Sequence, residues 1–198
     1  MTWYSTGTVD PSELEARFSE EDSMSYLDSI FTEPSEESLK LIARVKEIMQ
    51  DLPPREADFV DLYYFKHFRQ TDIAHMFCVS QPTVCYRLQR ATFRIQFLLQ
   101  LPEVKLEDMS SDLGAVLPDE LDIKIMILMY QTSCQSEVAK RLGVSQGLVR
   151  HRFLRSISRM EKAGLEFYYE IFVRVSQNLN VLREIPRSDD SLILRVVH

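Results

Sequence analysis

Hydrophobic residues recur at spacings of three and four along most of this 198-residue chain, a pattern typical of amphipathic helices. In the first half of the chain, this spacing predicts helices at about 35–52, 54–65, 70–77 and 81–100. The first of them has one apolar face, formed by Leu39, Leu41, Ile42, Val45, Ile48 and Met49. The chain has only five glycines, which favours helices over turn-rich β structure.

A similar pattern returns after a polar stretch. Residues 102–116 contain several acids and serines, and they are predicted to be a linker. Helices are then predicted at about 117–130 and 135–142, followed by one that begins near 146, bends or breaks at Ala163-Gly164 and continues towards Leu182. Residues 1–34 are acidic, with room for a short helix near Leu14–Phe18, and we expect them to be mostly disordered. The tail 186–198 ends in a β-prone run.

The two halves of the chain repeat each other at an offset of 65 residues. Between 70 and 94, nine of 25 positions are identical to the positions 65 residues later, without a gap. The clearest block is Val79-Ser80-Gln81, which repeats as Val144-Ser145-Gln146. Self-similarity of this kind indicates a duplicated structural unit.

The repeated residues fit a helix-turn-helix, in which two short helices cross at a steep angle through a tight turn. The crossing needs a small residue in the first helix, here Ala74 and Ala139. The turn favours a residue that tolerates left-handed backbone, and Gly143 does so, whereas Cys78 departs from this preference. Ser80 and Ser145 are predicted N-caps of the second helices, and Val79, Val84, Val144 and Val149 are predicted to face inward.

The remaining positions of each second helix are then expected to face outward, towards the major groove of DNA. Glutamine pairs well with adenine and arginine with guanine. The candidate base-reading residues are Gln81, Pro82, Thr83, Cys85, Tyr86, Gln146, Arg150 and His151. Arginines at spacings of three and four form a basic stripe suited to phosphates. The candidate phosphate-binding residues are Arg87, Arg90, Arg94, Lys140, Arg152, Arg155 and Arg159.

These patterns predict an all-α protein with two tandem helix-turn-helix (trihelical) units and a long C-terminal helix. The expected organisation is an acidic segment 1–34, a first helix-turn-helix domain 35–101, a linker 102–116, a second helix-turn-helix domain 117–162, a helical extension 163–185 and a tail 186–198.

The net charge of −7 is unfavourable for a DNA-binding protein, but the charge is unevenly distributed. Residues 1–40 hold ten acids and two bases, so the remainder of the chain is close to neutral. Residues 135–162 carry seven bases and two acids. The local sign of a surface decides how it meets phosphates, so double-stranded DNA stays the expected partner.

Other classes of function have little support in the sequence. The three cysteines, an odd number without a leader-like N-terminus, are expected to be reduced thiols, and neither a metal site nor a cofactor is expected. The chain shows neither a glycine-rich phosphate loop nor a metalloprotease motif, so no enzyme is expected. It lacks a membrane-length apolar run. The expected location is the cytoplasm or nucleoid of a bacterium, or a phage-infected host.

The first unit resembles the C-terminal region of bacterial sigma factors that reads the −35 promoter element. The residues that carry this resemblance are Leu52–Glu56, Gln70–Ala74, Val79–Val84 and Arg87–Ala91. The resemblance implies a three- or four-helix unit, a recognition helix at 81–91 and contact with RNA polymerase. A complete sigma factor also needs an aromatic-rich helical region, and only about 50 residues precede Leu52. The chain therefore looks like a duplicated sigma-type DNA-reading unit, of a kind used by phage and mobile-element proteins.

Three readings stay open. The chain is expected to be a transcription regulator or sigma-like factor that binds specific DNA sequences. It is alternatively a DNA-packaging subunit resembling phage small terminases, which form homo-oligomers through a helix such as 163–185. It is alternatively an adaptor that binds RNA polymerase. The apolar residues of 163–185 serve equally well for packing onto the chain's own body, and the acidic segment 1–40 suits either docking on a basic partner or solubilisation.

Overall fold

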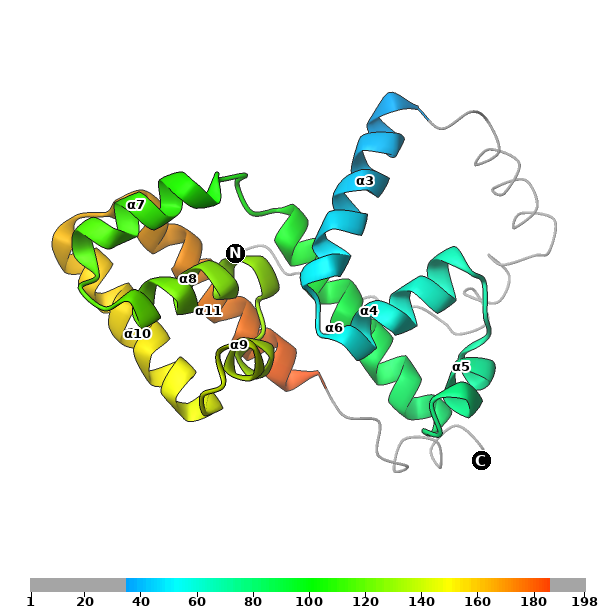
Figure 1. Ribbon diagram of the computed structural model, residues 1–198. Helices are drawn as coiled ribbons and strands as arrows, with labels where there is room; N and C mark the ends of the chain where they lie inside the picture. The colour runs from blue at the N-terminus through cyan, green and yellow to red at the C-terminus, as the bar shows by residue number, and fades with distance from the viewer. Residues whose placement is uncertain (1–34, 186–198) are drawn as a thin grey trace, which may run out of the picture. The chain divides into compact units, whose positions relative to one another are not determined.

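The computed structural model describes residues 35–185, and this part of the chain is entirely helical (Figure 1). This confirms the expected all-α class for the described residues. The chain divides into two compact units, 1–43 and 44–198, and the division falls inside the first described helix, α3 (Glu36–Asp51). The expected disorder and short helix within 1–34, and the tail 186–198, lie outside the described residues.

The apolar face expected on the first helix is only partly buried. Ile48, near the end of α3, is buried, whereas Leu39 and Ile42 in its first half are exposed. The Pro53-Pro54 pair ends the helix as expected, and Pro54 begins the next one, a position where its missing N–H costs nothing.

The first group of helices within unit 44–198 comprises α4 (Pro54–Val60), a π-helical turn η1 (Asp61–Phe65), α5 (Gln70–Met76) and α6 (Gln81–Leu99). Its core contains Phe59, Ile73 and Val84, each fully buried. Phe77 packs edge-on against Phe59, with ring centroids 4.8 Å apart. The single helix predicted over 54–65 therefore changes from α to π geometry at Asp61.

The stretch predicted to be a linker contains a helix. Residues Leu106–Val116 form α7, and two of its side chains, Met109 and Leu113, are fully buried. The difference has a simple cause. Leu106, Met109 and Leu113 follow helical spacing, but the serines and acids between them conceal the pattern.

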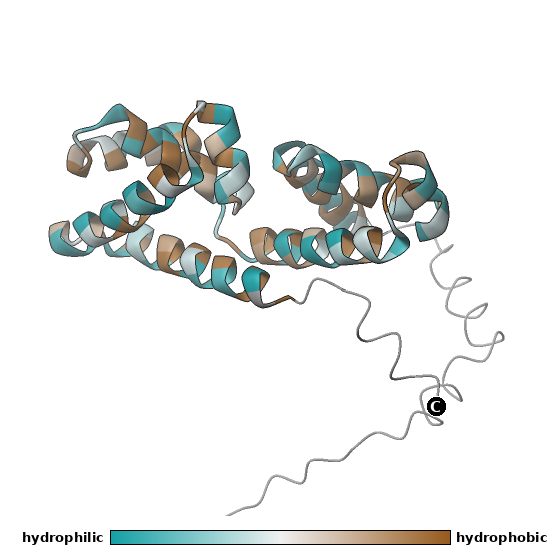
Figure 2. Cartoon of the chain, turned by 90° about the horizontal axis from the view of Figure 1, so that it is seen from below, coloured by the Kyte–Doolittle hydropathy of each residue, from teal (hydrophilic) through white to brown (hydrophobic). Residues whose placement is uncertain are grey.

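The second group comprises α8 (Glu120–Thr132), α9 (Gln135–Leu142) and α10 (Gln146–Ala163). Its core is built from Ile125, Met126, Val138, Val149 and Phe153, all fully buried. Figure 2 shows hydrophobic and hydrophilic residues alternating along the helices, as expected for helices that bury one face.

The C-terminal helix α11 (Glu166–Glu184) is separated from α10 by Gly164, whose φ of +71° ends α10. This bears out the break expected at Ala163-Gly164. The apolar face of α11 is buried within the chain's own core, with Phe172 and Val175 fully enclosed and Phe172 packed edge-on against Phe153 at 6.1 Å. The main apolar face of the segment 163–185 is therefore buried inside its own unit. None of the helices within 35–185 combines the length and the apolar character needed to span a membrane.

Candidate nucleic-acid interface

The same turn geometry occurs twice, 65 residues apart. Cys78 and Gly143 both have left-handed backbone, with φ of +50° and +66°. The N–H of the following valine donates to the carbonyl of the small residue in the preceding helix, Val79 to Ala74 and Val144 to Ala139, at 3.0 Å in both cases. Cys78 therefore takes the conformation for which glycine is better suited, and the departure seen in sequence does not alter the turn.

Serine caps the helix that follows each turn. The hydroxyl oxygen of Ser80 accepts from the N–H of Thr83 at 3.4 Å, and that of Ser145 accepts from the N–H of Leu148 at 3.2 Å. Both contacts satisfy an amide that has no partner within the helix. The valines expected to face inward one turn later, Val84 and Val149, are fully buried.

The candidate base-reading residues of α6 are mostly engaged with their neighbours. Gln81 is exposed, and its amide donates to the side-chain oxygen of Gln70 at 2.7 Å. The hydroxyls of Thr83 and Ser80 lie 2.8 Å apart, and the Tyr86 hydroxyl accepts from Arg90 at 2.8 Å. Pro82, Thr83, Cys85 and Tyr86 are all half-buried.

The candidate residues of α10 are more open. Gln146, Arg150 and His151 are exposed, as are Gly147 and Leu148 beside them. Lys140, on the preceding helix α9, is also exposed. Neither Lys140 nor Arg150 makes an ion pair or hydrogen bond with another residue in the range 35–185. Two cations and two polar side chains are therefore available at the start of α10 for a ligand.

The basic stripe of α10 surrounds a carboxylate that sequence reasoning missed. Asp122, on α8, is fully buried. Its two oxygens accept from Arg152 at 2.9 Å, from Arg155 at 2.9 Å and from Arg159 at 3.3 Å. The three guanidinium groups, which were expected to contact phosphates, therefore converge on one buried charge.

A second carboxylate, Asp119, adds to this cluster and links it to the start of α8. One of its oxygens accepts from Arg152, and the other accepts from the backbone N–H of Leu121 at 2.9 Å. The hydrogen bond from Arg152 is the main reason why the pKa of Asp119 is lowered, and the same contact raises the pKa of Arg152. Three cations and two carboxylates share the cluster, so it keeps an excess of positive charge beside α10.

Arg94 of α6, the arginine equivalent to Arg159 of α10, is buried. Arg94 is 1% exposed and forms an ion pair with Glu56 of α4. Its Nε also donates to the backbone carbonyl of Ser133 at 3.3 Å. Burial lowers the pKa of Arg94 from its ordinary value. The expectation that Arg94 contacts phosphates therefore fails in this structure, because its guanidinium is enclosed and already paired.

The other two arginines of α6 differ from each other. Arg90 donates to the backbone carbonyl of Leu182 in α11 at 2.9 Å, so it ties two helices together. Arg87 is half-buried and makes no ion pair or hydrogen bond within the described part of the chain. Of the three arginines predicted to form a stripe on α6, only Arg87 is left for a ligand.

Glu56 and Asp122 could have been suspected from the sequence. Each lies on the first helix of its group, α4 or α8, and each pairs with the arginine at the same place in the repeat, Arg94 or Arg159. The carboxylates themselves are out of register by one position, since 65 residues after Glu56 comes Leu121. A search for identical residues at the fixed offset therefore does not find them.

Among residues 35–185, no group of three or more histidine, cysteine, aspartate or glutamate side chains is arranged to hold a metal ion. Comparisons of the chain with protein-family models, with curated proteins and with solved structures find no match.

Proposed function

We propose that α4–α6 and α8–α10 are two helix-turn-helix units and that the chain binds double-stranded DNA in a sequence-specific manner, as a regulator of transcription. The observation that carries the proposal is the turn that occurs twice. A left-handed residue, an N–H···O=C contact of 3.0 Å and a serine cap recur together at the same offset. These features set the angle between a short helix and the longer helix that follows it, which is what a recognition helix needs in order to enter a major groove.

The second unit makes the main contact with DNA in this proposal. Gln146, Arg150 and His151 stand on the exposed side of the first two turns of α10, where recognition helices reach base edges. Lys140 lies on the preceding helix and suits a phosphate. The first unit offers fewer free side chains, because its candidates are half-buried or hydrogen-bonded to one another.

The arginines of α10 have an indirect role. Arg152, Arg155 and Arg159 hold α10 against α8 through Asp122, and so fix the direction in which the start of α10 points. The positive charge left over in this cluster attracts the phosphate backbone without a direct hydrogen bond. A DNA-packaging ring built through 163–185 finds no support in the described residues, because the apolar face of α11 is already buried.

Selection of bound duplexes from a random pool tests the proposal, followed by measurement of affinity for the selected sequence. Arg150→Ala is expected to weaken binding of the selected duplex by about ten- to a hundredfold, because a well-placed arginine contributes about 1–3 kcal/mol of discrimination. The matched control is Lys162→Ala, which removes an exposed cation from the opposite end of the same helix. The proposal fails if no sequence is enriched. It also fails if Arg150→Ala binds the selected duplex as tightly as Lys162→Ala and the unchanged protein do at low salt.

A further inference from the structure

Several exposed aromatic residues belong to the first unit. Tyr64, Phe65 and Phe68 are 50%, 37% and 40% exposed, and Phe93, on α6, is 50% exposed. Tyr64 and Phe93 line one groove together with the half-buried Tyr63, and we call these three residues the aromatic surface. Phe65 lies instead beneath the Lys46 ammonium, 5.7 Å from its ring centroid. Large exposed aromatic side chains that lie together usually mark a binding site, because leaving them in water is unfavourable.

The local backbone explains why these rings point outward. The π-helical turn Asp61–Phe65 widens the end of α4, and its last hydrogen bond runs from the N–H of Lys66 to the carbonyl of Asp61 at 3.0 Å. His67 then takes a left-handed backbone with φ of +57°, and the N–H of Phe68 returns to the carbonyl of Leu62 at 2.9 Å. Uncommon geometry of this kind concentrates at functional sites.

A groove of about 320 Å³ adjoins the aromatic surface, and the residues that line it are uncharged. Tyr63, Tyr64 and Phe93 contribute rings, and Gln70, Gln89 and Gln96 contribute side-chain amides. The rings of Tyr63 and Tyr64 meet edge to face, with centroids 4.9 Å apart. The groove therefore combines flat apolar faces with hydrogen-bonding groups that can donate or accept.

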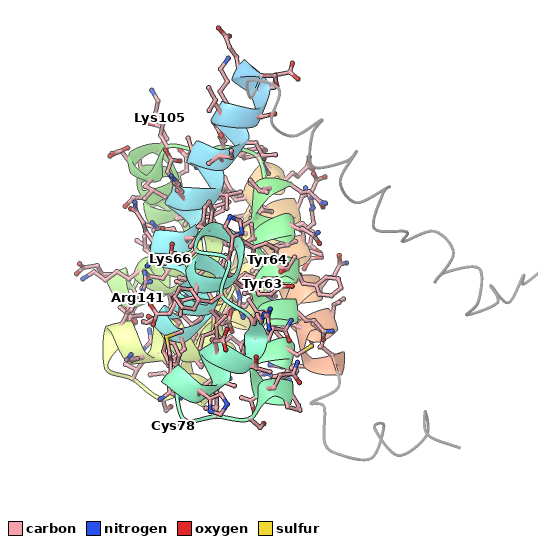
Figure 3. The ribbon with its side chains drawn as sticks, turned by 90° about the vertical axis from the view of Figure 1, so that its right-hand side faces the viewer. Tyr63, Tyr64, Lys66, Cys78, Lys105 and Arg141 are labelled. Atoms are coloured by element: carbon pink, nitrogen blue, oxygen red, sulfur yellow. The ribbon has the colours of Figure 1, made fainter. Side chains whose placement is uncertain are left out.

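Two cations follow the tyrosines along the chain. Lys66 and Arg69 come soon after Tyr64 in the sequence, and both are exposed. Figure 3 shows Tyr63 and Tyr64 on the side of the molecule that carries Lys66. Lys66 pairs with Asp61 at 2.7 Å, but the two side chains are 56% and 41% exposed, so water weakens this ion pair and a phosphate can replace the carboxylate.

We propose that the aromatic surface binds an unpaired DNA strand. Bases stack on the rings, and Lys66 and Arg69 contact the phosphates between them. Only an unpaired strand offers base faces, because in a duplex these faces are covered by neighbouring base pairs. A neutral groove lined by rings, with exposed cations close by in the sequence, fits a strand with a charged backbone and flat neutral bases better than it fits an apolar protein. The surface is distinct from the start of α10, so this inference goes beyond duplex binding.

The test is a titration of the full chain into a fluorescein-labelled oligothymidine of about 12 nucleotides, followed by anisotropy. The double variant Tyr64→Ala/Phe93→Ala is expected to weaken binding by about 5- to 100-fold, since stacking on each ring is lost. Tyr64→Phe keeps the ring and is expected to bind within about twofold of the unchanged protein. The matched control is Phe167→Ala, which removes a ring that is 53% exposed on α11.

Two further arms separate this proposal from duplex binding. Arg150→Ala is expected to leave oligothymidine affinity unchanged, so failure of one proposal is visible while the other stands. An oligouridine of equal length is expected to bind no more tightly than oligothymidine. The proposal is overturned if oligothymidine does not bind at about 50 mM salt, if only oligouridine binds, or if the double variant binds as tightly as Phe167→Ala.

Discussion

The two three-helix groups share a backbone plan but hold their last helices, α6 and α10, in different ways. In the first group, one buried arginine of α6 pairs with one glutamate, Arg94 with Glu56. In the second, three partly exposed arginines of α10 surround Asp122. The comparison teaches that a duplicated sequence can keep its turn and its arginine positions while a shift of one residue in the partner carboxylate changes the electrostatics around the helix.

The exposed faces of the two groups differ as well. The start of α10 presents Gln146, Arg150 and His151, whereas the side of α6 presents Phe93 next to the exposed Tyr64. A basic and polar face suits duplex DNA, and an aromatic face suits unpaired bases. The two groups therefore have different proposed ligands, and changes to either one can be assayed separately.

The largest expected effect is that of Asp122→Asn. Loss of this charge leaves three arginines facing one another around a buried amide, so we expect the free energy of unfolding to fall by about 3 kcal/mol. Urea denaturation followed by circular dichroism measures the change. The control on the same helix is Glu120→Gln, whose exposed ion pair with Lys124 is expected to contribute less than about 0.5 kcal/mol. Equal stability of the two variants would contradict a central role for Asp122.

The buried pair of the first group is the next test. Glu56→Gln leaves Arg94 enclosed without its counter-charge, and we expect a loss of about 2 kcal/mol, since the carbonyl of Ser133 still accepts from the arginine. The double variant Glu56→Gln/Arg94→Met removes both charges and is expected to recover at least half of that loss. A double variant less stable than the single one would show that Arg94 contributes mainly through contacts other than Glu56.

The turns should respond in opposite directions to exchange of their left-handed residues. Cys78→Gly removes strain from a φ of +50° and is expected to stabilise by about 1 kcal/mol, whereas Gly143→Ala is expected to destabilise by about 1 kcal/mol. A Cβ on Gly143 would meet nothing within 4 Å, so its cost is backbone strain alone. Gly147→Ala, within α10, is the control and is expected to stabilise slightly. If all three substitutions changed the free energy of unfolding in the same direction, backbone conformation would not explain the effects.

Most of the helices could be predicted from the sequence, because most of them bury a face with regular spacing. It could not be predicted which charged side chains are buried and which are exposed. Arg87, Arg90 and Arg94 lie at spacings that place them near one face of α6, yet Arg94 is enclosed and Arg87 is not. Spacing places residues around a helix, but burial depends on which neighbouring helix carries a carboxylate.

Two other features escaped prediction for related reasons. The helix α7 was concealed because its buried residues are few and are separated by serines and acids that also suit loops. The change from α to π geometry at Asp61 has no compositional signal, since Asp61–Phe65 are ordinary helix residues. The composition of each segment therefore reveals neither feature.

The smallest expected effect concerns Asp119, a carboxylate present only in the second group, because Pro54 occupies the equivalent place in the first. Its pKa in the folded chain is lowered, chiefly by the hydrogen bond from Arg152. The ionised form is therefore favoured by folding, and its contribution is present above the ordinary pKa of 3.8 and is lost as the pH falls through the lowered value. Asp119→Asn keeps a side-chain oxygen for the N–H of Leu121, so it removes the charge and retains the cap.

We therefore expect Asp119→Asn to melt slightly below the unchanged protein at pH 7, with the difference closing as the pH falls below 3.8. Melting temperatures measured by circular dichroism at pH 7 and below pH 3.8 test this expectation. Pro54→Ala changes the equivalent place in the first group without altering a charge, so its effect should not depend on pH. A gap for Asp119→Asn that stayed constant with pH would mean that the charge of the carboxylate does not contribute to stability. The two groups would then differ through Asp122 and its three arginines alone.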